Sequence, residues 1–269
     1  MAVHTSLFFV GAATVGLKYN PVGAVVDQIL GYRNGAHVPS VAMSLVALAA
    51  TGAAGDAVDN STLSSARVQS PKTVISPVYV RPINAASNFP ADPSVCCFSA
   101  NPVILRAGEE FSASATVVVA GEPEERPVVV VAWLCDRVEP VPQDETYWVP
   151  FTTALPEAGA STWQTVSITF QDTTTLPAGR YAILGLHLVT PDPTVLCGRL
   201  VIPGEKLRPG TITSPSAAAL TPPLASDNSL GVWGHFDAQL PPSLELFAPP
   251  GSTPVGTLSG FLRVAQVSR

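Results

Sequence analysis

The stretch Asn101–Ala120, NPVILRAGEEFSASATVVVA, constrains the fold more than any other part of the chain. Apolar Val103–Leu105 is followed by a break at Arg106–Glu109, in which Gly108 can supply the positive φ that a tight turn needs. Apolar residues then alternate with small or hydroxylated residues as far as Val119. A period of two over this length indicates a strand with one buried face. We therefore predict a β-hairpin here.

The rest of the chain repeats this pattern of short apolar runs and turn signals. Prolines and glycines, 27 and 20 in number, are spread between the runs without forming a low-complexity tract. Proline at such positions ends strands and protects sheet edges. After the hairpin we expect strands at Val128–Leu134, Tyr147–Thr152, Trp163–Phe170, Arg180–Val189 and Val195–Ile202. The sequence predicts an all-β fold, a β-sandwich or jelly roll with two stacked β units and little helix.

The predicted domain division follows from where the strands are dense. Residues 93–205 are expected to form a central β-sandwich, jelly-roll or Ig-like. The strands expected in 1–92 and 206–269 are too few to close separate sheets, so these two segments are expected to form one base unit together. The alternative is two sandwiches stacked in chain order. We also expect residues 1–55 to be the main assembly surface, because this part carries the least charge.

Two apolar segments near the start of the chain need an assignment. Ser6–Leu17 and Ser40–Ala54 are both shorter than the roughly 20 residues that span a bilayer as a helix. We therefore expect both to lie inside the folded or assembled protein. Val22–Leu30 fits either a short helix or a strand, and Val38–Ala50 is apolar on every side, which indicates burial in the core or against a partner.

Charge is sparse along the whole chain. Only 13% of residues are charged while 46% are hydrophobic, and the charged share is about half the usual one. A surface with so little charge favours an interface with other subunits. The formal net charge is -6, only three lysines occur, and no basic run is present. Direct binding of nucleic acid is therefore disfavoured.

The histidines do not form a recognisable catalytic or metal-binding pattern. His4, His37, His187 and His235 are scattered without HxH or HExxH spacing. We expect His187 to be a hydrogen-bonded residue of the core or of a sheet edge, and His235 to pack among aromatic residues. A GxSxG elbow and a phosphate-binding glycine loop are also missing from the sequence. We predict no catalytic, cofactor-binding or metal-binding residue, and no enzymatic activity.

Carboxylates and aromatic residues offer the other candidates for a site. Glu109 and Glu110 are adjacent in a predicted turn, where we expect both to be solvated. The loop with Asp56, Asp59 and Asn60 lacks the full calcium-loop pattern, and Asn60-Ser61-Thr62 matches a glycosylation acceptor that is common by chance.

Three aromatic residues could line a carbohydrate-binding face. Tyr147, Trp148 and Trp163 lie in predicted strands. Their alternation also suits core residues, and we favour the core.

Four cysteines are too few for a disulfide scaffold at this length. Cys96 and Cys97 are adjacent and would point to opposite faces of a strand. Cys135 and Cys197 each end or begin an apolar run. We expect buried free thiols, with a Cys135–Cys197 bridge between sheets as the alternative.

The C-terminal half resembles the jelly-roll major capsid proteins of tailless icosahedral bacteriophages. The resemblance rests on LPAGRYAILGLHLV at 176–189, RPG at 208–210, GVWGHF at 231–236 and PPSLELF at 241–247. It implies a virion protein built from one or two jelly rolls per chain, often packed over an internal membrane, with a structural role and no active site. The chain lacks the basic arm with which many coat proteins bind their genome.

These observations together predict a structural capsid protein that self-assembles into an icosahedral shell. Its partners would be copies of itself, with other capsid proteins or an internal membrane as further contacts. Many weak apolar contacts between subunits would add up as the shell closes. The alternative is a surface or secreted β-sandwich module that recognises carbohydrate or protein.

Overall fold

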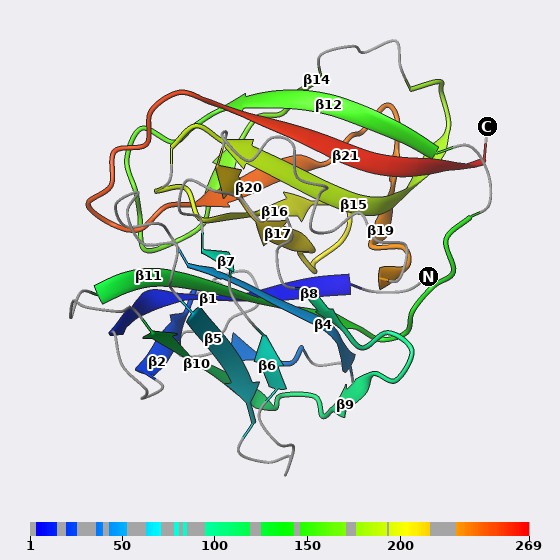
Figure 1. Ribbon diagram of the computed structural model, residues 1–269. Helices are drawn as coiled ribbons and strands as arrows, with labels where there is room; N and C mark the ends of the chain where they lie inside the picture. The colour runs from blue at the N-terminus through cyan, green and yellow to red at the C-terminus, as the bar shows by residue number, and fades with distance from the viewer. Residues whose placement is uncertain are drawn as a thin grey trace. The chain divides into compact units, whose positions relative to one another are not determined.

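The computed structural model divides the chain into two compact units (Figure 1). The C-terminal unit comprises Met1–Ser6 and Leu134–Arg269, and the N-terminal unit is Leu7–Trp133. The structure describes residues 4–14, 20–25, 36–39, 43–52, 63–70, 78–80, 83–84, 95–118, 125–142, 146–170, 176–192, 194–215 and 230–268. Within these ranges all regular elements are β-strands, which confirms the all-β prediction.

The N-terminal unit is one 11-stranded sheet that folds into layers. Its strands are β1 (His4–Thr14), β2 (Asn20–Ala24), β3 (Ala36–His37), β4 (Met43–Gly52), β5 (Leu63–Gln69), β6 (Val78–Val80), β7 (Ile83–Asn84), β8 (Val95–Cys97), β9 (Val103–Leu105), β10 (Glu110–Val118) and β11 (Glu125–Cys135). The main path runs β6-β5-β10-β2-β1-β11-β4-β7, with β3 beside β10 and both β8 and β9 beside β4. Strands β1 and β11 each have one end in the C-terminal unit.

Strand β2 carries the sheet from one layer to the next. Its first half pairs with β10, Val22 opposite Ala113, and its second half pairs with β1, Gly23 opposite Val10. The central strands are buried on both faces, which explains their nearly unbroken apolar sequences. Leu45–Ala50 of β4 and Val129–Trp133 of β11 are almost completely buried.

The predicted hairpin is wrong in its pairing, although both strands and the turn are present. Gly108 has a φ of 72°, and the Glu109 N–H donates to the Arg106 carbonyl across the turn. However, β9 pairs with β4, whereas β10 pairs with β2, β3 and β5. The turn therefore carries the chain between two layers, because a tight turn fixes the direction of the chain but not the partners of its strands.

The C-terminal unit consists of a six-stranded and a four-stranded sheet. The larger sheet contains β12 (Thr146–Ala154), β14 (Thr169–Phe170), β15 (Arg180–Thr190), β18 (Ser214–Pro215), β19 (Gly234–Asp237) and β21 (Thr257–Ser268). The smaller sheet contains β13 (Gln164–Val166), β16 (Cys197–Val201), β17 (Gly210–Ile212) and β20 (Ser243–Phe247). The sheets pack face to face where Gly198 of β16 meets Leu188 of β15, since a Cβ on Gly198 would lie 2.5 Å from the leucine side chain.

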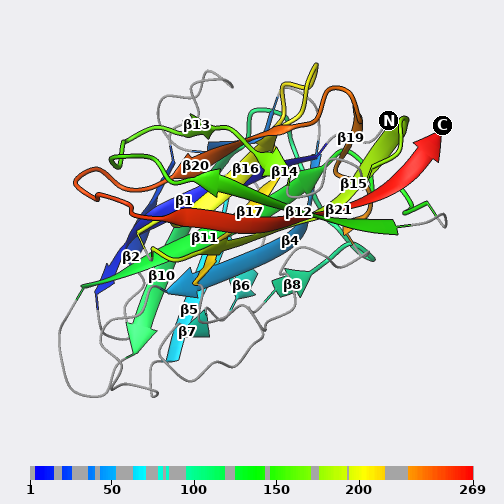
Figure 2. The same cartoon turned by 90° about the horizontal axis from the view of Figure 1, so that it is seen from above.

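The central strand of the larger sheet comes from the end of the described chain. β21 lies between β12 and β15 (Figure 2), and β20 likewise lies between β13 and β16. Residues 206–269 therefore share their sheets with residues 134–205, which differs from the predicted pairing of 206–269 with 1–92. The sequence identifies the strands, but which strands pair depends on contacts between distant segments that a local pattern does not encode.

Two stretches of residues 1–55, the segment predicted to be the main assembly surface, are buried. His4–Phe9 and Leu45–Ala50 are buried within the chain itself. These two stretches therefore belong to core strands, and their apolar character reflects burial inside the chain, whereas Pro21 and Gly23 of β2 are exposed.

Candidate functional site

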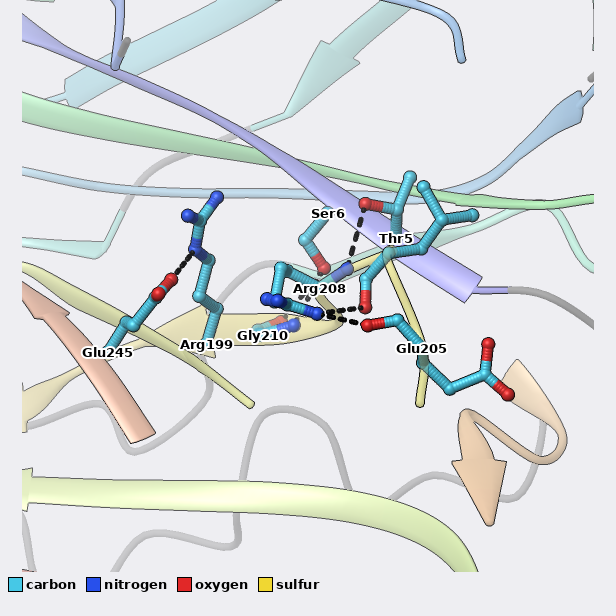
Figure 3. Close-up of polar contacts among 8 residues, drawn as sticks. Thr5, Ser6, Arg199, Glu205, Arg208, Gly210 and Glu245 are labelled. Atoms are coloured by element: carbon cyan, nitrogen blue, oxygen red, sulfur yellow. Dashed lines mark hydrogen bonds and ion pairs between the residues drawn. The ribbon is translucent and has the colours of Figure 1, made fainter. Parts of the chain in front are cut away.

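A group of buried polar residues in the C-terminal unit is the first candidate site (Figure 3). β16 and β20 place Arg199 directly opposite Glu245. The Arg199 Nε donates to the Glu245 Oε2 at 2.6 Å, and the residues are only 2% and 7% exposed. The Arg199 guanidinium carbon also lies 4.3 Å from the ring centroid of Trp163. A charge-assisted hydrogen bond and a cation–π contact thus stabilise the buried arginine.

Gly210 of β17 lies opposite Arg199 and belongs to the Arg208-Pro209-Gly210 turn, to which the start of β1 is hydrogen-bonded. The Ser6 N–H donates to the Arg208 carbonyl at 3.1 Å, and the Gly210 N–H donates to the Ser6 Oγ at 2.9 Å. The Ser6 hydroxyl donates in turn to the Gly210 carbonyl at 3.2 Å. The Arg208 N–H donates to the Thr5 Oγ1 at 3.4 Å. Thr5 and Ser6 therefore tie the start of the chain to the turn at 208–210.

The side chain of Arg208 strengthens this turn. Its Nη1 donates to the carbonyl of Glu205 at 2.6 Å (Figure 3). Gly210 allows the close approach, because a Cβ there would lie 2.6 Å from the Cα of Arg199. The charged groups thus bind backbone carbonyls and each other. This arrangement holds strands together.

None of these residues is predicted from the sequence as part of a site. One signal was available: Arg199 in CGRLV and Glu245 in SLELF are single charges inside apolar strands. Such a residue is rarely buried without a partner. RPG at 208–210 and PPSLELF at 241–247 contributed to the resemblance only through their sequence. In the structure, Arg208 of the first motif and Glu245 of the second make buried polar contacts.

A second candidate is the outer face of the six-stranded sheet. Register places Trp148 opposite Arg263, Pro150 opposite Phe261, and Phe261 opposite His187. We call these residues, on β12, β21 and β15, the Trp148 face. Their sequence neighbours Val149, Phe151, Leu262 and Val264 are buried on the other side of the sheet.

The Trp148 face combines exposed aromatic rings with one cation. Trp148 is 45% exposed and Phe261 is 40% exposed. The Arg263 guanidinium carbon lies 5.6 Å from the Trp148 ring centroid, and His187 stacks on Phe261 with centroids 6.3 Å apart. The predicted core role is therefore wrong for Trp148. Tyr147 points to the interior against Tyr181, and Trp163 is half-buried against Phe247.

Burial lowers the pKa of three histidines, His4, His187 and His235. It lowers the pKa of His4 to about 4, against which the Leu230 backbone and Asp136 have smaller, raising effects. His4 stacks on Trp233, with ring centroids 6.4 Å apart. Burial also lowers the pKa of His187 and of His235. The Nε2 of His235 lies 3.7 Å from Glu139, whose negative charge opposes this effect.

The described cysteines are free thiols, so the alternative of a Cys135–Cys197 bridge is wrong. Both thiols are buried, and burial raises the pKa of Cys135 to about 12 and that of Cys197 further. Cys97 is exposed on β8. The side chain of Cys96 lies outside the described residues.

The carboxylates give a mixed result. Glu109 is completely buried, so its expected solvation is wrong; it accepts hydrogen bonds from the Ser70 hydroxyl and from the Arg106 N–H. Glu110 is exposed as expected. The loop with Asp56, Asp59 and Asn60 lies outside the described residues. Among those that are described, no three of His, Cys, Asp and Glu come together in a group that could hold a metal ion.

The fold and the two candidate sites define an all-β protein of two units whose buried polar residues hold strands together. No protein family model matches the chain, and no curated protein matches its sequence. Across the ranges that the structure describes, there is no helix long and apolar enough to cross a membrane.

Proposed function

We propose that this protein is a structural coat subunit that self-assembles into an icosahedral virus shell. One observation carries the proposal: the chain forms two all-β units, and the polar side chains buried in the C-terminal unit hold its own segments together. A shell subunit needs a stiff body of this kind, because its contacts with neighbours are repeated many times and small distortions add up. The sparse charge of the surface also suits subunits that bury their flanks against each other.

The mechanism of such a subunit is geometric. Each contact with a neighbour is weak, and the closed shell is stable because every subunit makes several contacts at once. Arg199 and Glu245 contribute by fixing β16 against β20, and Ser6 contributes by fixing the start of β1 to the turn at 208–210. These contacts preserve the shape of the subunit.

The test is the particle size of the purified full chain at neutral pH and moderate salt. Sedimentation velocity and negative-stain electron microscopy should show closed shells or flat hexagonal sheets. A single species at the monomer mass of 27.9 kDa over a wide range of concentration would overturn the proposal.

A second candidate function is a surface module that binds carbohydrate. The observation in its favour is the exposure of Trp148, since aromatic rings on a sheet face can stack on sugar rings. It predicts a monomer that binds glycans on an array and loses binding in Trp148→Ala. A monomer that binds no glycan would contradict it.

A further inference from the structure

We infer that residues 4–6 form a pH-sensitive strap, which leaves the turn at 208–210 in mild acid while the sheets of the C-terminal unit stay paired. The strap would be a property of the single chain and does not depend on the proposed assembly. It consists of His4, Thr5 and Ser6, which are all buried. These residues belong to the C-terminal unit, although Ser6 and Gly210 lie 204 positions apart in the sequence.

A short series of hydrogen bonds holds the strap against the turn (Figure 3). The Ser6 N–H donates to the Arg208 carbonyl, and the Ser6 hydroxyl bonds to both backbone groups of Gly210. Thr5 adds a longer bond of 3.4 Å from the Arg208 N–H. The strands of the two C-terminal sheets pair with one another, and β1 is a member of neither sheet. The strap can therefore leave the turn without breaking a strand pairing within those sheets.

The ring of His4 makes the strap sensitive to protons. It is 2% exposed and stacks on Trp233, with ring centroids 6.4 Å apart. Among the described residues, none gives either ring nitrogen a hydrogen bond of normal geometry. Burial lowers the pKa of His4 to about 4, and the Leu230 backbone and Asp136 raise it by less. A proton on His4 would thus place a charge where the docked strap does not stabilise it.

The charged groups of the surrounding segments do not offset this effect. Among the described groups, Asp136 is the only carboxylate that acts on His4, and it is exposed, so water and salt screen its charge. Glu139 and Glu205 act on His235 instead. On the turn itself, Arg208 is a cation, which cannot stabilise a second positive charge. A protonated His4 is therefore better stabilised when its ring reaches water.

The direction of the pH effect follows from the two states of the strap. A released His4 has the ordinary pKa of 6.5 and the docked one a pKa of about 4, so release is favoured as the pH falls through this range. From pH 7 to pH 5 the ratio of released to docked strap should rise about twentyfold. Release would take Ser6 away from the backbone of Arg208 and Gly210. Acid would thus change the strand edge that the unit presents.

The test is hydrogen exchange of the full chain at pH 7 and pH 5, measured by mass spectrometry and corrected for the intrinsic effect of pH. Peptides with Ser6 and Gly210 report on the strap, and peptides from β16 and β20 report on the neighbouring sheet. His4→Phe keeps a ring against Trp233 but cannot bind a proton. The matched control is His187→Phe, which removes another buried histidine of the same unit outside the strap. Circular dichroism spectra and thermal melts check that each form is folded.

In the wild type and in His187→Phe, opening of the strap should increase about twentyfold from pH 7 to pH 5. In His4→Phe it should change by less than about twofold, because the titrating group is gone. Peptides from β16 and β20 should open less than the strap in every form. An equal increase in His4→Phe and wild type would overturn the inference, and so would an equal increase in the strap and in β16 and β20.

Ser6→Ala keeps the test decisive if His4→Phe does not fold. This variant removes the hydroxyl that bonds to Gly210 and leaves His4 unchanged. It should raise opening of the strap at pH 7 by at least about twofold and keep the wild-type response to pH. Unchanged opening at pH 7 would show that these hydrogen bonds do not hold the strap and would overturn the inference.

Discussion

His4 is expected to make the C-terminal unit unstable in mild acid. Its ring is buried against Trp233, and burial lowers its pKa from 6.5 to about 4. Between these values the unfolded chain binds a proton at His4 and the folded chain does not, so unfolding is favoured as the pH falls. The stability that depends on a neutral His4 is fully present above pH 6.5, decreases as the pH falls to about 4, and is lost below that value.

The size of the effect follows from the two pKa values. At about 1.4 kcal/mol for each pH unit, the difference between 6.5 and about 4 corresponds to a loss of about 3 kcal/mol. About 2 kcal/mol of this loss should occur between pH 7 and pH 5. That is a large part of the stability of a typical domain.

The assay is urea unfolding of unassembled protein at pH 7 and pH 5, followed by tryptophan fluorescence and circular dichroism. The matched variant is His4→Phe, which keeps an aromatic ring against Trp233 but cannot bind a proton. His187 and His235 titrate in both proteins, so their effects cancel in the comparison. The wild type should lose about 2 kcal/mol more than the variant between the two pH values. Equal losses in the two proteins would refute the assigned role of His4.

Three further changes test the packing of the C-terminal unit. Glu245→Gln should lower the free energy of unfolding by about 3–5 kcal/mol, because it leaves the Arg199 charge buried without its carboxylate. Urea titration measures this free energy, and a loss under about 1 kcal/mol would contradict the prediction. Gly210→Ala should cost about 1–3 kcal/mol, because its Cβ would meet the backbone of Arg199; an unchanged thermal melt would contradict the close approach. In the native protein a thiol reagent should label exposed Cys97 at least tenfold faster than the two buried thiols, which should react only after denaturation; mass spectrometry of labelled peptides would show any exception.

The sequence predicts the strands well because their signal is local. The alternation after Gly108 identifies β10, and the unbroken apolar run before Cys135 identifies β11. Pairing is different, since it joins residues that are far apart in the chain. Nothing near Phe261 indicates that its strand lies between β12 and β15.

The candidate sites were harder to predict for two physical reasons. Alternation separates the two faces of a strand but does not say which face is covered, so Trp148 was expected in the core although it is exposed. The Arg199–Glu245 pair required knowing that β16 and β20 are neighbours. A charge inside an apolar strand predicts that a partner exists, and the register of the sheet identifies it.

The position of β21 has a consequence for synthesis of the protein. β12 and β15 are made before the strand that pairs with both of them, Thr257–Ser268. Until then these two strands have open edges, and non-local pairing of this kind is slow to form. A chain cut short before β21 would keep those edges open and would expose them to quality control in the cell.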